Sequence, residues 1–416
     1  PPGYRLAELD DVADRDAMHD IDRWAFAFDF RPEDEQVHVW ELEPGRSVGV
    51  WHEGPRGTTL AAMHSSFEFR VQVPGGERVP AAGLTWVGVH PGHRRRGLSR
   101  AMLHSHLHRS RERGEVLSVL NAAESGIYGR YGYGIATHRV SATLGRGAEL
   151  RPVPGSEELV VEFESVDDAR HSSELEQVHG QVVRPGWITR DTDALRQMRV
   201  IDWPSARHRA ERRRIAFVRD AAGEPRGYAL FRRKGKWSDE GKPEGTVEVH
   251  DVLALDAPAA RALWAALLDL DLMGAVEVAN LAPDDAVLGL LTEVRGTNRK
   301  VHDDVWLRIL DLPAALRLRS YPCAVDVVLD VTDPLVPDNA GRWHVRGGPG
   351  GVEVARTDAP AQLALGIADL GATYLGGTPL TALAAAGRLT ELVPGSLLPA
   401  ATAFGWPVAP STGWGF

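Results

Sequence analysis

The sequence predicts a mixed α/β protein in which two successive α/β units precede a third, α+β region. The chain has 416 residues, which corresponds to two or three domains at about 150 residues each. Its composition, 43% hydrophobic and 25% charged, is typical of a folded globular chain. Short apolar runs typical of strands alternate with amphipathic segments typical of helices along most of its length.

The first unit extends over about the first 145 residues. Its acidic stretch at 8–23 is typical of the start of a helix. The pair Gly75–Gly76 predicts a hairpin turn, and the apolar stripe that begins at Leu98 predicts an amphipathic helix. In chain order, the expected elements are strands at 59–73 and 84–89, a helix at 97–113 and a buried strand at 116–120.

The turn-rich segment 151–158 predicts the start of the second unit, and the third region begins near Val301. The last segment, 398–416, is rich in aromatic residues, Pro and Gly and lacks periodicity, so we expect an extended tail docked on the rest of the chain. The expected elements are strands at 215–219, 226–234 and 245–255 with a helix at 257–270, then strands at 323–331, 341–346 and 351–356 with helices at 359–370 and 378–386.

Charge and cysteine content exclude several classes of protein. The formal charge of −10 argues against binding to nucleic acid or to an anionic membrane, and it permits cationic substrates. A single cysteine, Cys323, excludes an internal disulfide, argues against a cysteine metal site and fits a cytoplasmic location. The sequence has no stretch of 18 apolar residues and begins with an acidic segment, so we expect no membrane span and no secretion signal.

The segment LTWVGVHPGHRRRGLSRAML, residues 84–103, carries the densest chemical signal. A strand ends there in a Gly- and Arg-rich turn that opens a helix, which presents backbone N–H groups and a positive helix end to an anion. Gly97 allows close approach of a phosphate, and Arg94, Arg95 and Arg96 can add charge-assisted hydrogen bonds. The segment is either a pyrophosphate cradle or a solvated basic turn.

Residues 94–99, RRRGLS, match the R-x-x-G-x-G/A motif of the GNAT acetyltransferase superfamily, with Ser99 in place of the final Gly or Ala. Together with HRRRGL at 93–98, the phrase IYGRYGYG at 127–134 resembles the Eis (enhanced intracellular survival) family of N-acetyltransferases. Similar stretches at 263–274, 303–316 and 365–389, and the terminal GWGF, extend the resemblance over most of the chain.

The resemblance implies two GNAT-type domains in tandem followed by a sterol-carrier-protein-like α+β domain. The catalytic GNAT domain would cover residues 1–148, and a degenerate one, without the cofactor motif, residues 149–300. The sterol-carrier-like domain would cover residues 301–416, and its C-terminal tail would reach the active site. The resemblance also implies a homohexamer that uses acetyl-CoA and no metal. It would acetylate primary amines of polycationic, aminoglycoside-like molecules, at several positions.

The resemblance further implies direct transfer in a ternary complex. Tyr128 would be the general acid that protonates the leaving thiolate, with Tyr131 and Tyr133 as competitors for that role. The α-carboxylate of Phe416 would be the general base, unless the chain end is simply frayed. The implied cofactor contacts are Val87, Gly88, Val89, Arg95, Arg96, Gly97, Leu98, Ser99, Arg100, Ala123 and Glu124.

Aromatic and acidic residues alternate in the segment 23–35, a combination that suits cationic amines. The same alternation fits a packed helix-to-loop segment equally well. The residues that we would test for contact with the substrate are Phe26, Asp29, Trp40 and Trp86.

Two other functions remain open from the sequence. One is a protein lysine N-acetyltransferase, and the other is a non-catalytic protein that binds CoA or a lipid. His104 and His108 are spaced to share a helix face and bind a metal, but we favour an ordinary surface helix.

Overall fold

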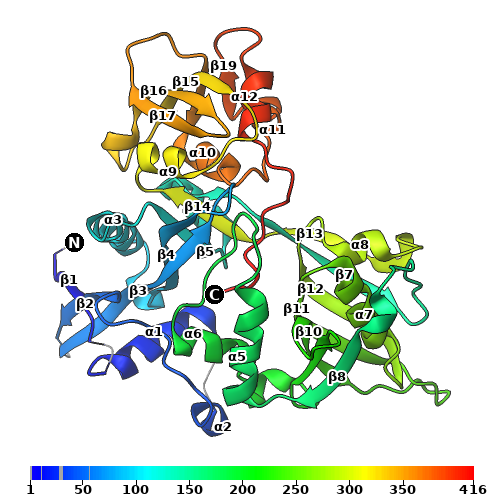
Figure 1. The fold of residues 1–416 in the computed structure, drawn as a ribbon. Helices are drawn as coiled ribbons and strands as arrows, with labels where there is room; N and C mark the ends of the chain where they lie inside the picture. The colour runs from blue at the N-terminus through cyan, green and yellow to red at the C-terminus, as the bar shows by residue number, and fades with distance from the viewer. Residues whose placement is uncertain (1, 11, 28–30, 56) are drawn as a thin grey trace.

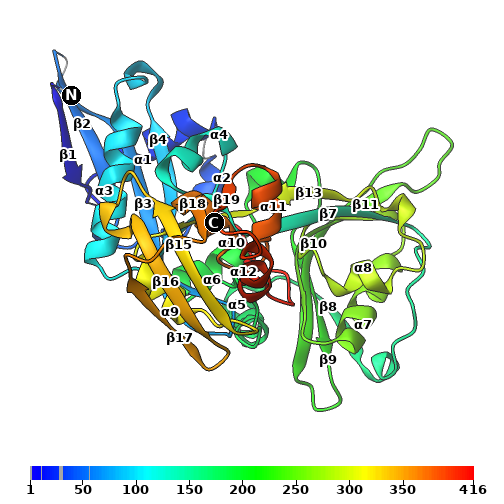
Figure 2. The same ribbon diagram turned by 90° about the horizontal axis from the view of Figure 1, so that it is seen from above.

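The computed structural model describes residues 2–10, 12–27, 31–55 and 57–416 (Figure 1). The described strands form three sheets, of seven, seven and five strands. Figure 1 shows the first two sheets side by side and the third above them, and Figure 2 shows the third sheet lying over the first. This arrangement confirms the predicted fold class. Among the described residues, no helix is long and apolar enough to cross a membrane.

The first sheet has the strand order β1-β2-β3-β4-β5-β14-β6, and only its β4–β5 pair is parallel. Strands β3 and β4 form the predicted hairpin around Gly75–Gly76. Helix α1 contacts β3 and β4, and α3 contacts β2, β3 and β4. The elements are β1 (Tyr4–Glu8), α1 (Arg15–Phe26), α2 (Pro32–Glu35), β2 (Val48–Gly54), β3 (Gly57–Gln72), β4 (Arg78–Val89), α3 (Leu98–Glu112), β5 (Leu117–Asn121), α4 (Ser125–Tyr128), β6 (Gly134–Ile135) and β14 (Val305–Ile309).

The second sheet has the order β13-β7-β12-β11-β10-β9-β8, and again only one pair, β11–β12, is parallel. Helix α7 contacts strands β8 to β12, as α3 contacts three strands of the first sheet. The elements are β7 (His138–Gly145), β8 (Val160–Ser165), α5 (Asp168–His179), α6 (Asp193–Val200), β9 (Arg214–Arg219), β10 (Pro225–Lys234), β11 (Gly245–Ala254), α7 (Ala257–Leu268), β12 (Met273–Leu281), α8 (Ala286–Leu290) and β13 (Lys300–Asp303).

The two units exchange strands. Strand β7 follows the first unit in sequence but pairs with β12 and β13 of the second sheet. Strand β14 follows β13 after a single residue, Asp304, and pairs with β5 and β6 of the first sheet. The domain boundaries expected at residues 148 and 300 therefore stay predictions for functional domains, since the sheets themselves cross them.

The third sheet has the order β17-β16-β15-β18-β19. Its hydrophobic core is continuous with that of the first sheet, because Phe67 and Leu307 belong to the same buried cluster as Leu370 and Phe404. The elements are α9 (Leu312–Leu318), β15 (Val325–Thr332), β16 (Gly341–Gly348), β17 (Gly351–Arg356), β18 (Leu363–Gly366), α10 (Ile367–Thr373), α11 (Leu380–Ala385), β19 (Leu389–Glu391) and α12 (Leu397–Phe404).

Two expectations for this region were wrong in part. The predicted helix at 359–370 contains strand β18, which pairs with β15 before α10 begins. The predicted extended tail begins with helix α12, and only residues 405–416 are extended. The sequence around Leu363 alternates apolar residues in a way that fits both a strand and a helix, which explains the first error.

The parallel strands of each of the first two sheets separate towards one end. Strand β4 pairs with β5 only over Ala81–Gly83, and a register shift of the β3–β4 pair leaves Trp86 at a φ of 52°. Strand β11 pairs with β12 up to Val249 and has a similar register shift near Asp251. Because the strands diverge, backbone groups of β4 and β11 face an open slot where each of these strands ends.

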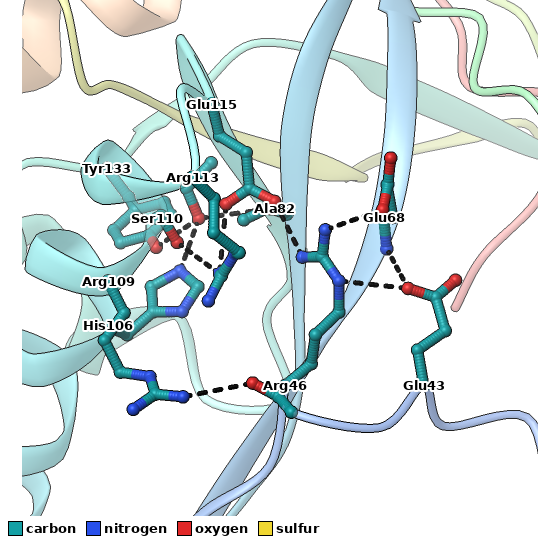
Figure 3. Close-up of polar contacts among 12 residues, drawn as sticks. Glu43, Arg46, Glu68, Ala82, His106, Arg109, Ser110, Arg113, Glu115 and Tyr133 are labelled. Atoms are coloured by element: carbon teal, nitrogen blue, oxygen red, sulfur yellow. Dashed lines mark hydrogen bonds and ion pairs between the residues drawn. The ribbon is translucent and has the colours of Figure 1, made fainter.

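A buried ion-pair network holds the first sheet to the loop before β2 and to the end of α3 (Figure 3). Arg46, 7% exposed, donates to Glu115 Oε1 at 2.6 Å and to Glu68 Oε2 at 3.1 Å, and it contacts Glu43 Oε2 at 3.0 Å. Arg113 donates to the other oxygen of Glu115 at 3.1 Å. The buried carboxylate of Glu115 thus has two cationic partners, Arg46 and Arg113, and together they hold the chain two residues before β5 begins.

Candidate active site

A cleft of about 700 Å³ opens where β4 ends and α3 begins. We call it the α3 cleft. Its walls are the last residues of β4, the turn that leads into α3, and the loop around α4, and Leu335 of the third region also contributes. The lining residues are Ala25, Val87, Val89, His93, Arg94, Arg95, Gly97, Leu98, Ser99, Arg100, His104, Glu124, Ile127, Tyr128, Arg130, Tyr131 and Leu335.

The turn before α3 is built to receive an anion. Arg95 and Gly97 both have positive φ, 60° and 79°, a conformation that turns successive backbone N–H groups to one side. Gly97 caps α3 without a side-chain hydrogen bond, and the first turn of α3 holds no acidic residue, so its N–H groups and positive end are open to a ligand. A Cβ added to Gly97 would meet no atom within 4 Å. Open space, N–H donors and arginines together fit a diphosphate.

Most of the expected cofactor residues line this cleft, and three do not. Gly88 faces α1 instead, since a Cβ there would lie 2.7 Å from Ile21 Cγ2. Arg96 turns away and donates from Nη1 to the hydroxyl of Tyr4 at 3.0 Å. Ala123 is exposed outside the cleft. The expected residues that do line it are Val87, Val89, Arg95, Gly97, Leu98, Ser99, Arg100 and Glu124.

Tyr128 ends α4 and lies in the wall of the α3 cleft, with 8% of its surface exposed. Burial raises the pKa of its phenol to about 12, and the nearby Glu124 carboxylate adds to the rise. Tyr128 therefore carries its proton throughout the ordinary pH range and can donate a hydrogen bond into the cleft.

Of the two competing tyrosines, Tyr131 stays in the wall of the cleft and Tyr133 does not line it. Tyr131 also lines the cleft, with 7% of its surface exposed. Tyr133 is 1% exposed, and its hydroxyl bonds to Ser118 Oγ at 2.7 Å, which in turn bonds to His106 Nε2 at 2.8 Å (Figure 3). The hydroxyl of Tyr133 is thus engaged in the core, while its ring supports Tyr128 edge-on at 6.0 Å between centroids.

The C-terminal tail, residues 405–416, is held by hydrogen bonds at Ala409, Ser411, Thr412 and Phe416. Arg184 Nη1 donates to Ala409 O at 2.7 Å and pairs with Asp284 at 2.6 Å. Thr412 Oγ1 donates to the buried carboxylate of Asp304 at 3.2 Å. The tail also lines a second cleft, of about 370 Å³, between the Arg184 loop and the end of β11.

The last residue, Phe416, lies against the first sheet. Its backbone N–H donates to Asn121 Oδ1 at 3.1 Å, and its ring packs on Phe69 at 4.8 Å between centroids. Asn121 ends β5, seven residues before Tyr128 in sequence, and its amide also donates to Asp304 O at 3.0 Å. One network of Asp304, Thr412 and Asn121 therefore positions the chain end beside the strand that leads to Tyr128.

The expected substrate residues do not line the α3 cleft. Trp40 and Trp86 lie edge-to-face at 5.7 Å between centroids, and Phe26, at the end of α1, is 46% exposed. Asp29 lies outside the described residues.

Two buried carboxyl groups, Asp22 and Glu41, were missed by the sequence reasoning. Both are under 10% exposed, and Glu41 adjoins Trp40 in sequence. Burial raises the pKa of Asp22 to about 6, and burial together with the Asp22 charge raises that of Glu41 to about 7.

Other residues of the cleft also went unpredicted, notably His93, His104 and Ile127, although His93 directly precedes the motif that was recognised. On α3, His104 and His108 are exposed as expected for a surface helix, whereas His106 between them is buried against Ser118. Within the described part of the chain, no group of three His, Cys, Asp or Glu side chains is arranged to hold a metal ion.

Comparison with known families gives the class of the protein. Residues 6–136 and 186–309 each match an acetyltransferase (GNAT) domain, and residues 312–413 match a sterol carrier protein domain. The molecule is thus an N-acetyltransferase with two GNAT domains and a sterol-carrier-like domain, and its GNAT domains imply the use of acetyl-CoA.

Individual relatives define the family more narrowly. The chain is 40% identical over 387 residues to an uncharacterized N-acetyltransferase of Streptomyces avermitilis, and the match covers 92% of each chain. It is 32% identical over 376 residues to N-acetyltransferase Eis of Mycobacterium tuberculosis, covering 85% of this chain and 86% of the relative. Eis1 from Mycobacterium abscessus superposes with a TM-score of 0.83 at 30% identity, covering 99% of this chain and all of that one. The chain belongs to the Eis family of N-acetyltransferases.

Proposed function

We propose that this acetyltransferase transfers the acetyl group of acetyl-CoA to primary amines of polycationic small molecules, aminoglycoside-like in chemistry, at several positions. Transfer is direct, in a ternary complex. Tyr128 protonates the leaving thiolate, and the α-carboxylate of Phe416 accepts the proton of the attacking amine. The observation that carries the proposal is that the anion-binding turn follows β4, while Asn121, at the end of the neighbouring strand β5, both precedes the Tyr128 segment and accepts from the backbone N–H of Phe416.

The chemistry of the cleft supports direct transfer. The bond that forms joins the amine nitrogen to the acetyl carbon, and the bond that breaks is the C–S bond of the thioester. The cleft contains no cysteine among the described residues that line it, so no thiol is at hand for an acetyl-enzyme intermediate. Tyr128 keeps its proton at neutral pH and can transfer it to a thiolate held at the end of the slot beside β4.

The tail contacts support the role of the terminal carboxylate. A carboxylate is ionised at neutral pH and can hold an ammonium group and take its proton. The backbone of Phe416 is fixed by Asn121, and its ring is fixed by Phe69, so the terminal group is ordered by two independent contacts. A fixed base loses less entropy than a free one when the amine binds.

The acidic region around α1 supports a polycationic substrate. Asp22 is a buried residue of α1, Glu41 is buried and bonds to the side chain of Trp86, and the Trp86 ring lies against that of Trp40. The indole faces attract ammonium groups, and Asp22 and Glu41 attract them in their ionised forms, whose pKa values are about 6 and about 7. We also propose a homohexamer in the cytoplasm, on the strength of the family resemblance and the single cysteine.

The test is a thiol-release assay with acetyl-CoA and a panel of amines: an aminoglycoside, spermine and a lysine peptide with a blocked N-terminus. We expect turnover on the two small polyamines and little on the peptide. The variants are Tyr128→Phe and a chain with one glycine added after Phe416, with Tyr133→Phe as the matched control for loss of a buried phenol.

We expect the first two variants to lose about two orders of magnitude in kcat, the usual size of a general acid–base contribution, and Tyr133→Phe to lose far less. Preference for the lysine peptide would support a protein lysine acetyltransferase. Full activity of the extended chain would refute the role of the Phe416 carboxylate. Binding of acetyl-CoA with no turnover of any amine would refute the proposed substrate class.

A further inference from the structure

The hydrogen bonds of Tyr4 fix the protonation pattern of a neighbouring histidine. Tyr4 lies on the edge strand β1, and its hydroxyl oxygen accepts a hydrogen bond from Arg96 Nη1 at 3.0 Å. The same hydroxyl lies 2.8 Å from His93 Nδ1. A guanidinium can only donate, so the Tyr4 hydrogen is left over for His93, and this arrangement favours Nδ1 as its acceptor.

A neutral imidazole whose Nδ1 accepts a hydrogen bond must carry its hydrogen on Nε2. Within the described part of the chain, no protein group bonds to the Nε2 of His93. The neighbours of His93 favour the neutral ring, because burial together with the adjacent His52, His90 and Arg96 lowers its pKa. His93 thus has one fixed N–H donor that the protein itself does not use.

The unused donor belongs to the cleft that takes the cofactor. His93 lines the α3 cleft with Arg94 and Arg95, and it stands in the turn that immediately precedes the backbone N–H groups of the anion-binding segment. A ring contact with His52, 4.8 Å between centroids, supports the imidazole from β2. An imidazole N–H at such a place is a suitable partner for a phosphate oxygen.

We propose that His93 binds a phosphate group of acetyl-CoA through its Nε2–H, and that Tyr4 and Arg96 act as positioning residues that hold it in the required tautomer. Arg96, although it is part of the motif RRRGLS, reaches the cofactor only through Tyr4 and His93. The edge strand β1 thereby becomes part of cofactor recognition, and the arginines that contact phosphate directly are those that line the cleft.

The test compares three acetyl donors that lose phosphate groups stepwise: acetyl-CoA, acetyl-dephospho-CoA and S-acetyl-pantetheine. The variants are His93→Leu, which removes the donor, and His93→Gln, whose amide can accept from Tyr4 and still donate to phosphate. Tyr4→Phe removes the hydroxyl but keeps the ring under Arg96, which lies 6.0 Å from the ring centre. An exposed histidine on α3, His108, provides the control His108→Leu.

We expect His93→Leu to raise the KM for acetyl-CoA about tenfold, the effect of one hydrogen bond to a charged group, with kcat changed less than twofold. Tyr4→Phe should raise it about threefold, and His93→Gln should restore most of the affinity. With S-acetyl-pantetheine, which has no phosphate, wild type and all variants should have the same KM. His108→Leu should behave as wild type with every donor.

The KM for acetyl-dephospho-CoA, which keeps the diphosphate and lacks the 3′-phosphate, shows which phosphate group His93 contacts. A penalty that persists with acetyl-dephospho-CoA assigns His93 to the diphosphate, and a penalty that disappears assigns it to the 3′-phosphate; either result supports the proposal. An unchanged KM in His93→Leu would refute it. An equal penalty with S-acetyl-pantetheine would refute it as well, because that result means a structural role without phosphate contact.

Discussion

The two GNAT units of this chain have the same scaffold and different chemistry at equivalent positions. Each has a seven-stranded sheet with one parallel pair, a register shift in the strand that leads to the main helix, and a slot where the parallel strands part. In the first unit the slot ends in the Gly97 turn and free N–H groups of α3. In the second, Asp256 accepts from Ala259 N–H and Pro258 removes a donor, so the start of α7 is already capped and carries negative charge.

The surroundings of the two slots also differ in charge. The helix α1 side of the first unit buries carboxyl groups, Asp22 and Glu41. The corresponding side of the second unit contains ion-paired arginines, with Arg190 bonded to Glu176 and Arg199 bonded to Asp251. Both units thus have the slot, whereas the groups at its end favour a diphosphate only in the first unit.

The largest effect should come from the turn itself. Gly97→Glu forces an L side chain into a φ of 79° and places a carboxylate in the anion-binding turn. We expect kcat/KM for acetyl-CoA to fall by more than about a hundredfold in steady-state kinetics, since both strain and repulsion oppose the diphosphate.

The matched change in the second unit, Asp256→Gly, removes the cap of α7. It should leave kcat/KM within about twofold and lower the free energy of unfolding by roughly a few tenths of a kcal/mol. A large decrease in kcat/KM in Asp256→Gly would contradict the claimed difference between the units, because it would mean that the slot beside β11 takes part in catalysis.

A buried acid should make the first unit sensitive to pH. The pKa of Glu41 is raised from its ordinary 4.5 to about 7, so between these values the folded protein holds a proton that the unfolded chain has lost. Stability therefore decreases as the pH rises through this window. Glu41→Gln should be more stable than wild type by about 3 kcal/mol at pH 8 and equal to it near pH 4.5, in urea unfolding.

The counterpart in the second unit should respond in the same direction but more weakly. Burial raises the pKa of Glu176 from its ordinary 4.5, and the charge of Arg190, 3.0 Å away, opposes that rise, so the free energy of unfolding should decrease less with pH through Glu176 than through Glu41. Equal pH dependence of Glu41→Gln and wild type would contradict the assignment of Glu41.

Both units hold the C-terminal tail, and the second unit should contribute to catalysis only through this contact. In the first unit, Asn121→Ala removes the acceptor for the Phe416 N–H, and we expect kcat to fall about tenfold, with the KM for acetyl-CoA within twofold of wild type. Arg184→Met removes the partly exposed contact with Asp284 and Ala409 and should cost less than about threefold. A greater loss from Arg184→Met than from Asn121→Ala would show that the tail is positioned mainly from the second unit.

The smallest expected effect is a flat pH profile. Because the pKa of Tyr128 is about 12, only about 1% of it is ionised at pH 10. We therefore expect kcat for a good amine to change less than twofold between pH 8.5 and pH 10, measured by thiol release. A descending limb with a midpoint near pH 9 would argue against Tyr128 as the proton donor.

The sequence was most informative where function depends on a continuous segment. The turn before Leu98 could be predicted because its glycine, arginines and following helix are adjacent in the chain. The prediction that Tyr128 is the general acid rested on the family resemblance, since three tyrosines within six residues are equivalent in pattern. They differ only in the fold, where Ser118 engages the hydroxyl of Tyr133.

Features assembled from distant segments were not predictable. Asp22 and Glu41 lie on different segments, and neither stands in a motif. The exchange of β7 and β14 between the first two sheets could not be predicted either, because local patterns identify a strand without identifying its partner strands. The network of Asp304 with Thr412 joins residues 108 positions apart, and nothing in the local sequence relates them.

The stoichiometry of acetyl-CoA binding tests the central claim most directly. Isothermal titration of the wild-type chain, of Gly97→Glu and of Asp256→Gly measures how many cofactor molecules each chain binds. We predict one site per chain in wild type and in Asp256→Gly, and none in Gly97→Glu. Two sites in wild type, or a remaining site in Gly97→Glu, would contradict the claim that only the first GNAT unit binds the cofactor.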